Sequence, residues 1–139
     1  MAKKKLLIEY DYDFLLFGIS CSEKLYRICW ALNNQLKLSL VKDKDIEVVE
    51  KNQIIHTKFP VFFFHQKETL TEYRVISNKI ENKLFVSEFK QADYLFVIQG
   101  NFLSAEKTNI LKKIKEVAFV QTAFEINPQQ IKSKDNFIF

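Results

Sequence analysis

The sequence predicts an α+β fold, a mainly antiparallel sheet with two principal helices packed on it. Short apolar runs of strand length recur along the chain, and two segments carry apolar residues at helical spacing. Their order is strands, helix, several strands, helix and strand, which lets both helices cover one sheet. The length of 139 residues and the hydrophobic content of 47% suit a single domain. We expect one α+β domain over residues 1–139, with a C-terminal tail over 128–139.

The first half of the chain is expected to form strands around one helix. Segments 5–10 and 14–20 have the length and apolar content of strands. Segment 22–36 is expected to be a helix, and its inner face is Leu25, Ile28, Cys29, Leu32 and Leu36. Segment 36–41 alternates like a half-buried strand, and the polar segment 42–53 is expected to be a loop or a short edge ribbon.

The next elements are predicted to be strands that pair with one another. Segment 58–66 is apolar in its middle, which indicates a strand covered on both faces or lying at a protein interface. Pro60 is best placed near its start or on a sheet edge. Segment 71–79 should pair with it across a polar turn, and segment 92–99, apolar on both faces, should be an inner strand.

The last third of the chain predicts a helix between two strands. A helix is expected over 105–117, with Ile110, Leu111, Ile114 and Val117 inward. A final strand is expected over 118–126. The strand–helix–strand from Tyr94 to Ile126 would be half of a split βαβ unit, so a ferredoxin-like relative is expected.

Composition argues against several classes of function. The net charge is +4, and Lys3, Lys4 and Lys5 account for three of these charges. The chain has two arginines, so nucleic-acid binding is only weakly supported. With two isolated glycines, no phosphate-binding loop is expected. No apolar segment approaches the ~20 residues of a membrane span, and the basic start lacks the apolar run of a signal peptide. We therefore expect a cytoplasmic protein.

The cysteines and histidines show no catalytic or metal-binding spacing. In a cytoplasmic protein, Cys21 and Cys29 are expected to be reduced thiols. They are eight positions apart, and neither they nor His56 and His65 form a zinc pattern. We therefore predict no metal, no cofactor and no catalytic constellation, and an enzyme is the less favoured class.

One stretch near residue 90 carries a resemblance to a known family. Residues 86–88 are Val-Ser-Glu, and after a gap of three residues 92–94 are Ala-Asp-Tyr. This resembles the motif of the IPExxxVDY family, small bacterial proteins without an assigned activity, with Ser87 in place of the family's proline. Segments 17–36 and 133–139 resemble that family's first helix region and its usual ending. The resemblance implies a small cytoplasmic domain and names no reaction.

Glu88, Asp93 and Tyr94, the letters shared with that motif, have two interpretations. They could form a site in which two carboxylates act with a tyrosine that donates a proton or clamps a ligand. However, neighbouring residues in a strand point to opposite faces, which separates Asp93 from Tyr94. We therefore favour an architectural role, in which the carboxylates bind backbone N–H groups or lysines and the tyrosine lies in the core.

Two surfaces on the predicted helices are candidates for binding. Tyr26 and Trp30, beside Arg27, could form a stacking platform for a base or a partner peptide, or they could simply cover the sheet edge, which we favour. The lysines of the second helix could contact phosphates or form a solvated face. These lysines are Lys107, Lys112, Lys113 and Lys115.

The chain closes on Phe137, Ile138 and Phe139 after a polar segment. These residues could dock onto the domain as an added strand, onto a second copy, or onto another protein. The leading hypothesis is a non-enzymatic interaction or adaptor protein that could also form a homodimer. The alternatives are an RNA-binding protein that uses the basic helix face, and an enzyme or ligand sensor centred on Glu88, Asp93 and Tyr94.

Overall fold

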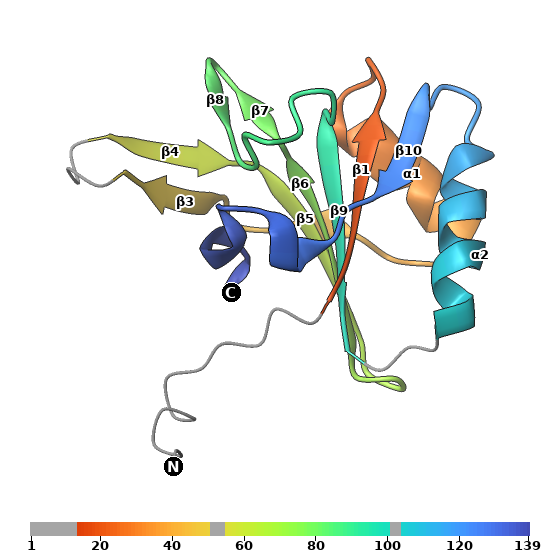
Figure 1. The fold of residues 1–139 in the computed structure, drawn as a ribbon. Coiled ribbons are helices and arrows are strands. Elements are labelled where there is room, and N and C mark those ends of the chain that lie inside the picture. Colours follow the sequence, from red (N-terminus) through yellow and green to blue (C-terminus); the bar gives the residue numbers. More distant parts are fainter. Residues whose placement is uncertain (1–13, 51–54, 101–103) are drawn as a thin grey trace, which may run out of the picture.

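A mainly antiparallel sheet with two helices on one side forms the molecule, as a computed structural model of residues 14–50, 55–100 and 104–139 shows (Figure 1). The strands of the main sheet are β1 (Leu15–Ser20), β2 (Val41–Lys42), β5 (Val61–Gln66), β6 (Thr71–Ser77), β9 (Tyr94–Gln99) and β10 (Thr122–Glu125). Two ribbons pair β3 (Ile46–Val49) with β4 (His56–Phe59), and β7 (Lys79–Ile80) with β8 (Lys83–Leu84). The helices are α1 (Leu25–Leu36) and α2 (Ser104–Lys115). The predicted fold class is confirmed.

The strand order of the main sheet is β10–β1–β9–β6–β5–β2, and each neighbouring pair is antiparallel. Because β1 lies between β9 and β10, those two strands run parallel, and α2 connects them as a split βαβ unit. In the same way β9 lies between β1 and β6, and the connection from β1 to β6 contains α1. The strands β10–β1–β9–β6 thus have the ferredoxin-like order, and the chain inserted between α1 and β6 extends the sheet beyond β6 by β5 and β2.

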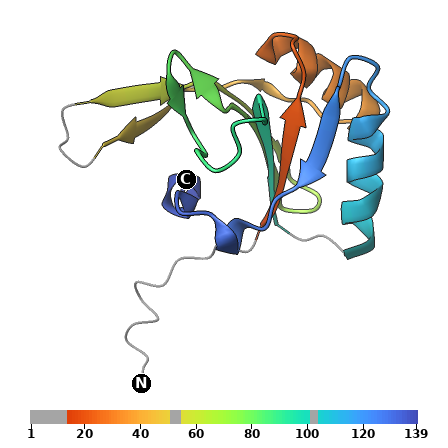
Figure 2. The same ribbon diagram turned by 45° about the horizontal axis from the view of Figure 1, so that its top comes forward.

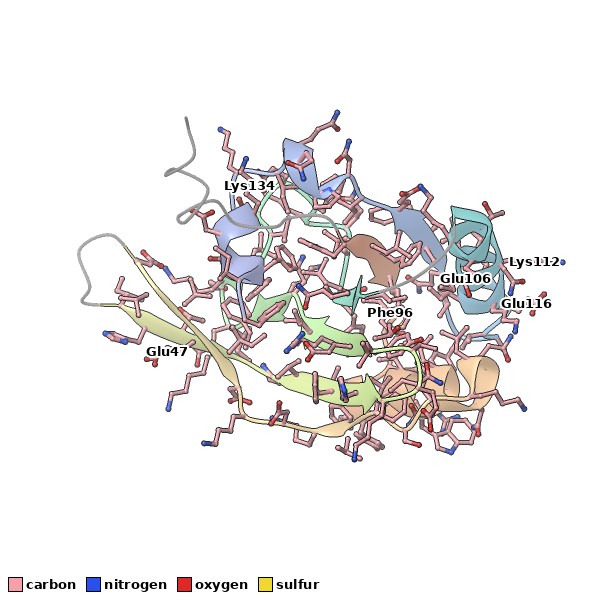
Figure 3. All side chains as sticks on the ribbon, turned by 90° about the horizontal axis from the view of Figure 1, so that it is seen from below. Glu47, Phe96, Glu106, Lys112, Glu116 and Lys134 are labelled. Carbon is pink, nitrogen blue, oxygen red and sulfur yellow. The ribbon has the colours of Figure 1, made fainter. Side chains whose placement is uncertain are left out.

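The sheet separates two apolar clusters. The helix-side cluster includes Phe17, Ile28, Leu32, Phe96 and Ile114. The far-side cluster includes Phe59, Phe85, Leu95, Val97 and Phe137. Strand β9 supplies both, since alternate side chains point to opposite faces, and Phe96 lies deep among the strands (Figure 3). Its prediction as an inner strand is confirmed, although the strand begins at Tyr94 and Ala92, just before it, belongs to the far-side cluster.

The far side is covered by two connecting segments that contain no α-helix (Figure 2). One is the connection between β6 and β9. The other is the C-terminal segment, residues 128–139, which contains the 3-10 helices η2 (Pro128–Gln130) and η3 (Lys134–Phe137). Its Ile131 and Phe137 are 3% and 2% exposed, so the segment is part of the core. It docks on its own domain, but not as the added strand that we considered.

Several predicted boundaries differ from the structure. The strand expected over 5–10 lies outside the described residues. The strand expected over 36–41 is wrong, because α1 continues to Leu36 and only β2 pairs with the sheet. Leu38 and Leu40 are nevertheless buried in the helix-side cluster, and the Asn33 side chain bonds both the N–H and the carbonyl of Leu40 as the chain leaves the helix. The last strand begins at Thr122, because a turn occupies the residues before it.

The segment expected to be a loop or edge ribbon does form a ribbon, in which β3 pairs with β4. Pro60 separates β4 from β5, as expected for a residue that lacks a backbone N–H. None of the described helices is both long and apolar enough to cross a membrane.

Candidate functional site

Glu88 and Asp93 both accept hydrogen bonds from distant backbone groups. The Glu88 Oε2 atom accepts the backbone N–H of Lys132, in the C-terminal segment. The Asp93 Oδ2 atom lies 2.9 Å from the backbone nitrogen of Cys21, directly after β1. Its Oδ1 atom lies 3.1 Å from the Lys79 Nζ atom. The two carboxylates therefore connect different parts of the fold.

Tyr94 lies on the helix side of the sheet and is only 8% exposed. Its hydroxyl donates a hydrogen bond to the carbonyl of Glu23, just before α1. Burial, together with the nearby Cys21 and Asp93, raises the pKa of Tyr94 to about 12. A tyrosine held in its neutral form and bonded to the backbone is suited to fixing the start of the helix. The three motif side chains thus make three separate structural contacts, which supports the architectural interpretation.

Asn78 is a central polar residue that sequence analysis missed. It is 0% exposed. Its Nδ2 atom donates to the carbonyls of Phe89 and Ala92 at 3.1 and 2.9 Å, and its Oδ1 atom accepts the N–H of Val86 at 2.7 Å. Asn78 thereby holds the segment that contains the motif. The sequence offers one signal, a polar residue directly after a buried strand, which equally suits an ordinary turn.

The structure brings neither cysteine together with a histidine in a catalytic or metal-binding group among the described residues. Cys21 and Cys29 are free and buried, and burial raises the pKa of each thiol, which disfavours the reactive thiolate. His56 lies 2.7 Å from Glu47 on the β3–β4 ribbon, and His65 lies 3.7 Å from Glu72. Within residues 14–50, 55–100 and 104–139, no three His, Cys, Asp or Glu side chains form a group that could hold a metal.

The most exposed aromatic side chains of the described chain stand on α1. Tyr26 is 64% exposed and Trp30, one turn later, is 58% exposed. The guanidinium carbon of Arg27 lies 5.4 Å from the centre of the Trp30 ring and 5.5 Å from the centre of the Phe119 ring. A role in covering the sheet edge, which we favoured from the sequence, fits these exposures poorly.

A groove runs beside these residues, between α1 and the chain that follows α2. It has a volume of about 360 Å³. Its lining includes Arg27, Trp30, Asn34, Gln35, Glu116 and Phe119. We call it the aromatic groove. The Gln35 amide donates to the Glu116 carboxylate at 3.0 Å and to the Lys113 carbonyl at 3.1 Å, so the two helices are joined along the groove.

The lysines of α2 form a mixed surface. Lys107 makes an ion pair with Glu125 at 3.0 Å. Lys112 and Lys115 are exposed, and with Glu116 they line a second, neighbouring groove. Figure 3 shows Lys112 and Glu116 projecting from the outer side of α2. The basic face that we predicted is therefore interrupted by acidic residues.

The predicted aromatic tail divides into a buried and an exposed part. The Phe137 ring packs 5.2 Å from both Phe14 and Phe85, measured between ring centres, inside the far-side cluster. Phe137 is therefore not a surface residue open to a partner. Ile138 and Phe139 are 43% and 46% exposed, so only these two could reach one.

Fold and surface together define an α+β domain with a ferredoxin-like strand order and an exposed aromatic groove on its helix layer. No protein-family model, curated protein or solved structure matches the chain. The resemblance to the IPExxxVDY family stays a prediction that rests on the residues quoted for it.

Proposed function

We propose that this protein is a non-enzymatic interaction module that binds a protein partner through the aromatic groove and the adjoining Tyr26 side chain. One observation carries the proposal, the exposure of Tyr26 and Trp30 one turn apart on a rigid helix beside a groove. Tyr, Trp and Arg are the residue types that dominate binding energy at protein interfaces. Exposure of a large aromatic side chain to water is unfavourable in free energy, so a cluster of such side chains on a surface indicates a binding role.

The neighbouring Arg27 strengthens this proposal. Its guanidinium carbon lies 5.4 Å from the centre of the Trp30 ring and 5.5 Å from that of the Phe119 ring, and such cation–π contacts favour one arrangement of the three side chains. Less conformational entropy is lost on binding when the contact residues are already ordered. The surface is thus suited to binding without a large rearrangement.

Membership of the IPExxxVDY family and a cytoplasmic location belong to the same proposal. Glu88, Asp93 and Tyr94 each make a tertiary contact, as the defining residues of a fold would. Two free cysteines are in keeping with a reducing compartment.

The test compares capture of partners from lysate by wild type and by a Tyr26→Ala, Trp30→Ala double variant. A matched control is Val41→Ala, Leu70→Ala, since these side chains are 62% and 66% exposed and do not line the groove. We expect a partner that the control retains and the double variant loses. Equal capture by all three proteins would count against the proposal. Light scattering on the purified protein shows whether that partner is a second copy.

Deleting residues 137–139 is a poor test, although the sequence suggests it. Phe137 is part of the core, so the truncated protein would lose stability and partners together.

A further inference from the structure

We propose that the aromatic groove binds an acidic peptide segment, with the Arg27 guanidinium as the receptor for one of its carboxylates. This inference rests on the proposed function and adds the chemistry of the partner. Its basis is the arginine of the groove, unpaired among the described residues, together with the lysines of the neighbouring groove.

The two arginines of the chain are in opposite situations. Arg74 lies 3.1 Å from the Glu72 carboxylate, so its charge is satisfied within the protein. Arg27 is positioned by two aromatic rings, and in the described part of the chain it makes no ion pair. A guanidinium presents a planar pair of donors that matches a carboxylate in two parallel hydrogen bonds. Arg27 therefore offers a carboxylate receptor that no acidic group of the described chain occupies.

The charges around the groove have the sign that an acidic segment requires. Lys112 and Lys115 line the neighbouring groove, which shares Glu116 with the aromatic groove, and neither pairs with an acidic group among the residues described. The acidic group in the groove, Glu116, accepts a hydrogen bond from Gln35. Opposite charge at the rim raises the rate of encounter and selects the partner.

The other side chains of the groove favour a peptide over RNA. Trp30 and Phe119 offer apolar surface beside the guanidinium, which suits a segment that alternates acidic with aromatic or aliphatic residues. A phosphate backbone carries a charge at every nucleotide and could not avoid Glu116, whereas a peptide that alternates acidic and apolar residues can place an apolar residue beside that carboxylate. Lys107, which would extend a basic track along α2, is already paired with Glu125.

A library of random 12-residue peptides displayed on phage provides the probe. Peptides are selected on wild type alone, so that peptides which do not need Arg27 are also recovered. We expect enrichment of Asp and Glu next to aromatic or aliphatic residues. In fluorescence polarisation, the best peptide should bind Arg27→Gln about ten- to a hundredfold more weakly, as expected for a lost charged hydrogen bond. Arg27→Lys should be intermediate, and Lys44→Gln, which removes one exposed charge outside the groove, should bind like wild type.

Three other outcomes would overturn the inference. Selected peptides without acidic residues, which need Trp30 but not Arg27, would remove the acidic partner and keep the proposed function. If no peptide binds, and a lysate partner is captured equally well without Trp30, both the acidic-peptide inference and the proposed function are wrong. A short single-stranded RNA that binds in a salt-sensitive way and is lost in Arg27→Gln, when acidic peptides do not bind, would replace the peptide by RNA.

Discussion

The guanidinium carbon of Arg74 lies 4.2 Å from the centre of the Phe139 ring. The same carbon lies 4.7 Å from the centre of the Phe63 ring, so Arg74 of strand β6 contacts both a neighbouring strand and the C-terminal segment through cation–π interactions. The Asn136 amide adds a hydrogen bond of 3.1 Å to the Phe85 carbonyl. These contacts attach the segment to the far side of the sheet.

Phe137→Ala and Phe139→Ala should therefore differ strongly in stability. Phe137 is 2% exposed, and its loss leaves a cavity that costs about 3–5 kcal/mol of unfolding free energy. Phe139 is 46% exposed, and its loss removes mainly the contact with Arg74, which is worth about 0.5–1 kcal/mol. Urea denaturation followed by fluorescence measures both values. Equal losses of unfolding free energy in the two variants would contradict the burial of Phe137 in the far-side cluster.

Asn78→Ala should destabilise the protein far more than Asn82→Ala. Asn78 is fully buried and satisfies two carbonyls and one N–H, and each group left without a partner costs about 1–3 kcal/mol. Asn82 is exposed, so its substitution should stay within about 0.5 kcal/mol of wild type. Hydrogen exchange should also show faster opening of the Val86 N–H in Asn78→Ala. A stable Asn78→Ala protein with unchanged exchange would contradict the bracing role.

The fold class was predictable because it depends on periodicity, which is a local property. The apolar stripe of α1 and the two apolar faces of β9 are visible in the sequence. Their prediction did not require knowing which other elements they pack against. The strand expected over 36–41 failed for the opposite reason. The alternation of apolar and polar residues in this segment correctly predicts that Leu38 and Leu40 are buried. Whether the segment also pairs with a strand depends on residues distant in the sequence.

The surface was less predictable than the core. A helical repeat separates Tyr26 and Trp30 from the apolar stripe, but it does not show whether a neighbouring element covers them. Their exposure depends on where α2 and Phe119 lie, which follows from long-range packing. The role of Asn78 was hidden in the same way, because its partners lie 8 to 14 positions further along the chain.

Gly18→Ala should change the sign of its effect with the residue at position 124. Gly18 lies opposite Phe124 in the sheet, and a Cβ atom at Gly18 would lie 2.6 Å from the Phe124 Cζ atom. In wild type we expect a loss of about 1–3 kcal/mol from overpacking, because Phe124 also packs against Phe89. In a Phe124→Leu background the clash with the ring is removed and only the Ala92 Cβ atom, at 3.2 Å, must shift slightly, so alanine should then stabilise the strand by up to about 0.5–1 kcal/mol relative to glycine.

Chemical denaturation of the four proteins of this double-mutant cycle gives the coupling between positions 18 and 124 directly. Additive effects of the two substitutions would show that the Phe124 ring does not lie over Gly18.

Tyr94→Phe should lower stability at neutral pH, and its deficit should shrink in alkali. At pH 7 the variant loses the hydrogen bond to the Glu23 carbonyl, at a cost of about 0.5–1.5 kcal/mol. In the folded protein burial raises the pKa of Tyr94 to about 12, whereas an unfolded tyrosine ionises near 10. The stabilisation is therefore complete below pH ~10 and is lost as the pH rises toward 12, because only the unfolded chain gains by releasing the proton.

The measurement is urea denaturation of wild type and Tyr94→Phe at several pH values from 7 to 11.5. Burial also raises the pKa of Tyr73, but Tyr73 is present in both proteins, so its effect cancels in the difference. Absorbance at alkaline pH provides an independent check, since the tyrosine that titrates latest should be missing from the variant. A stability difference that stays constant across this range would mean that Tyr94 has the same pKa in the folded and the unfolded protein. That result would contradict a buried, neutral Tyr94 hydroxyl at the start of α1.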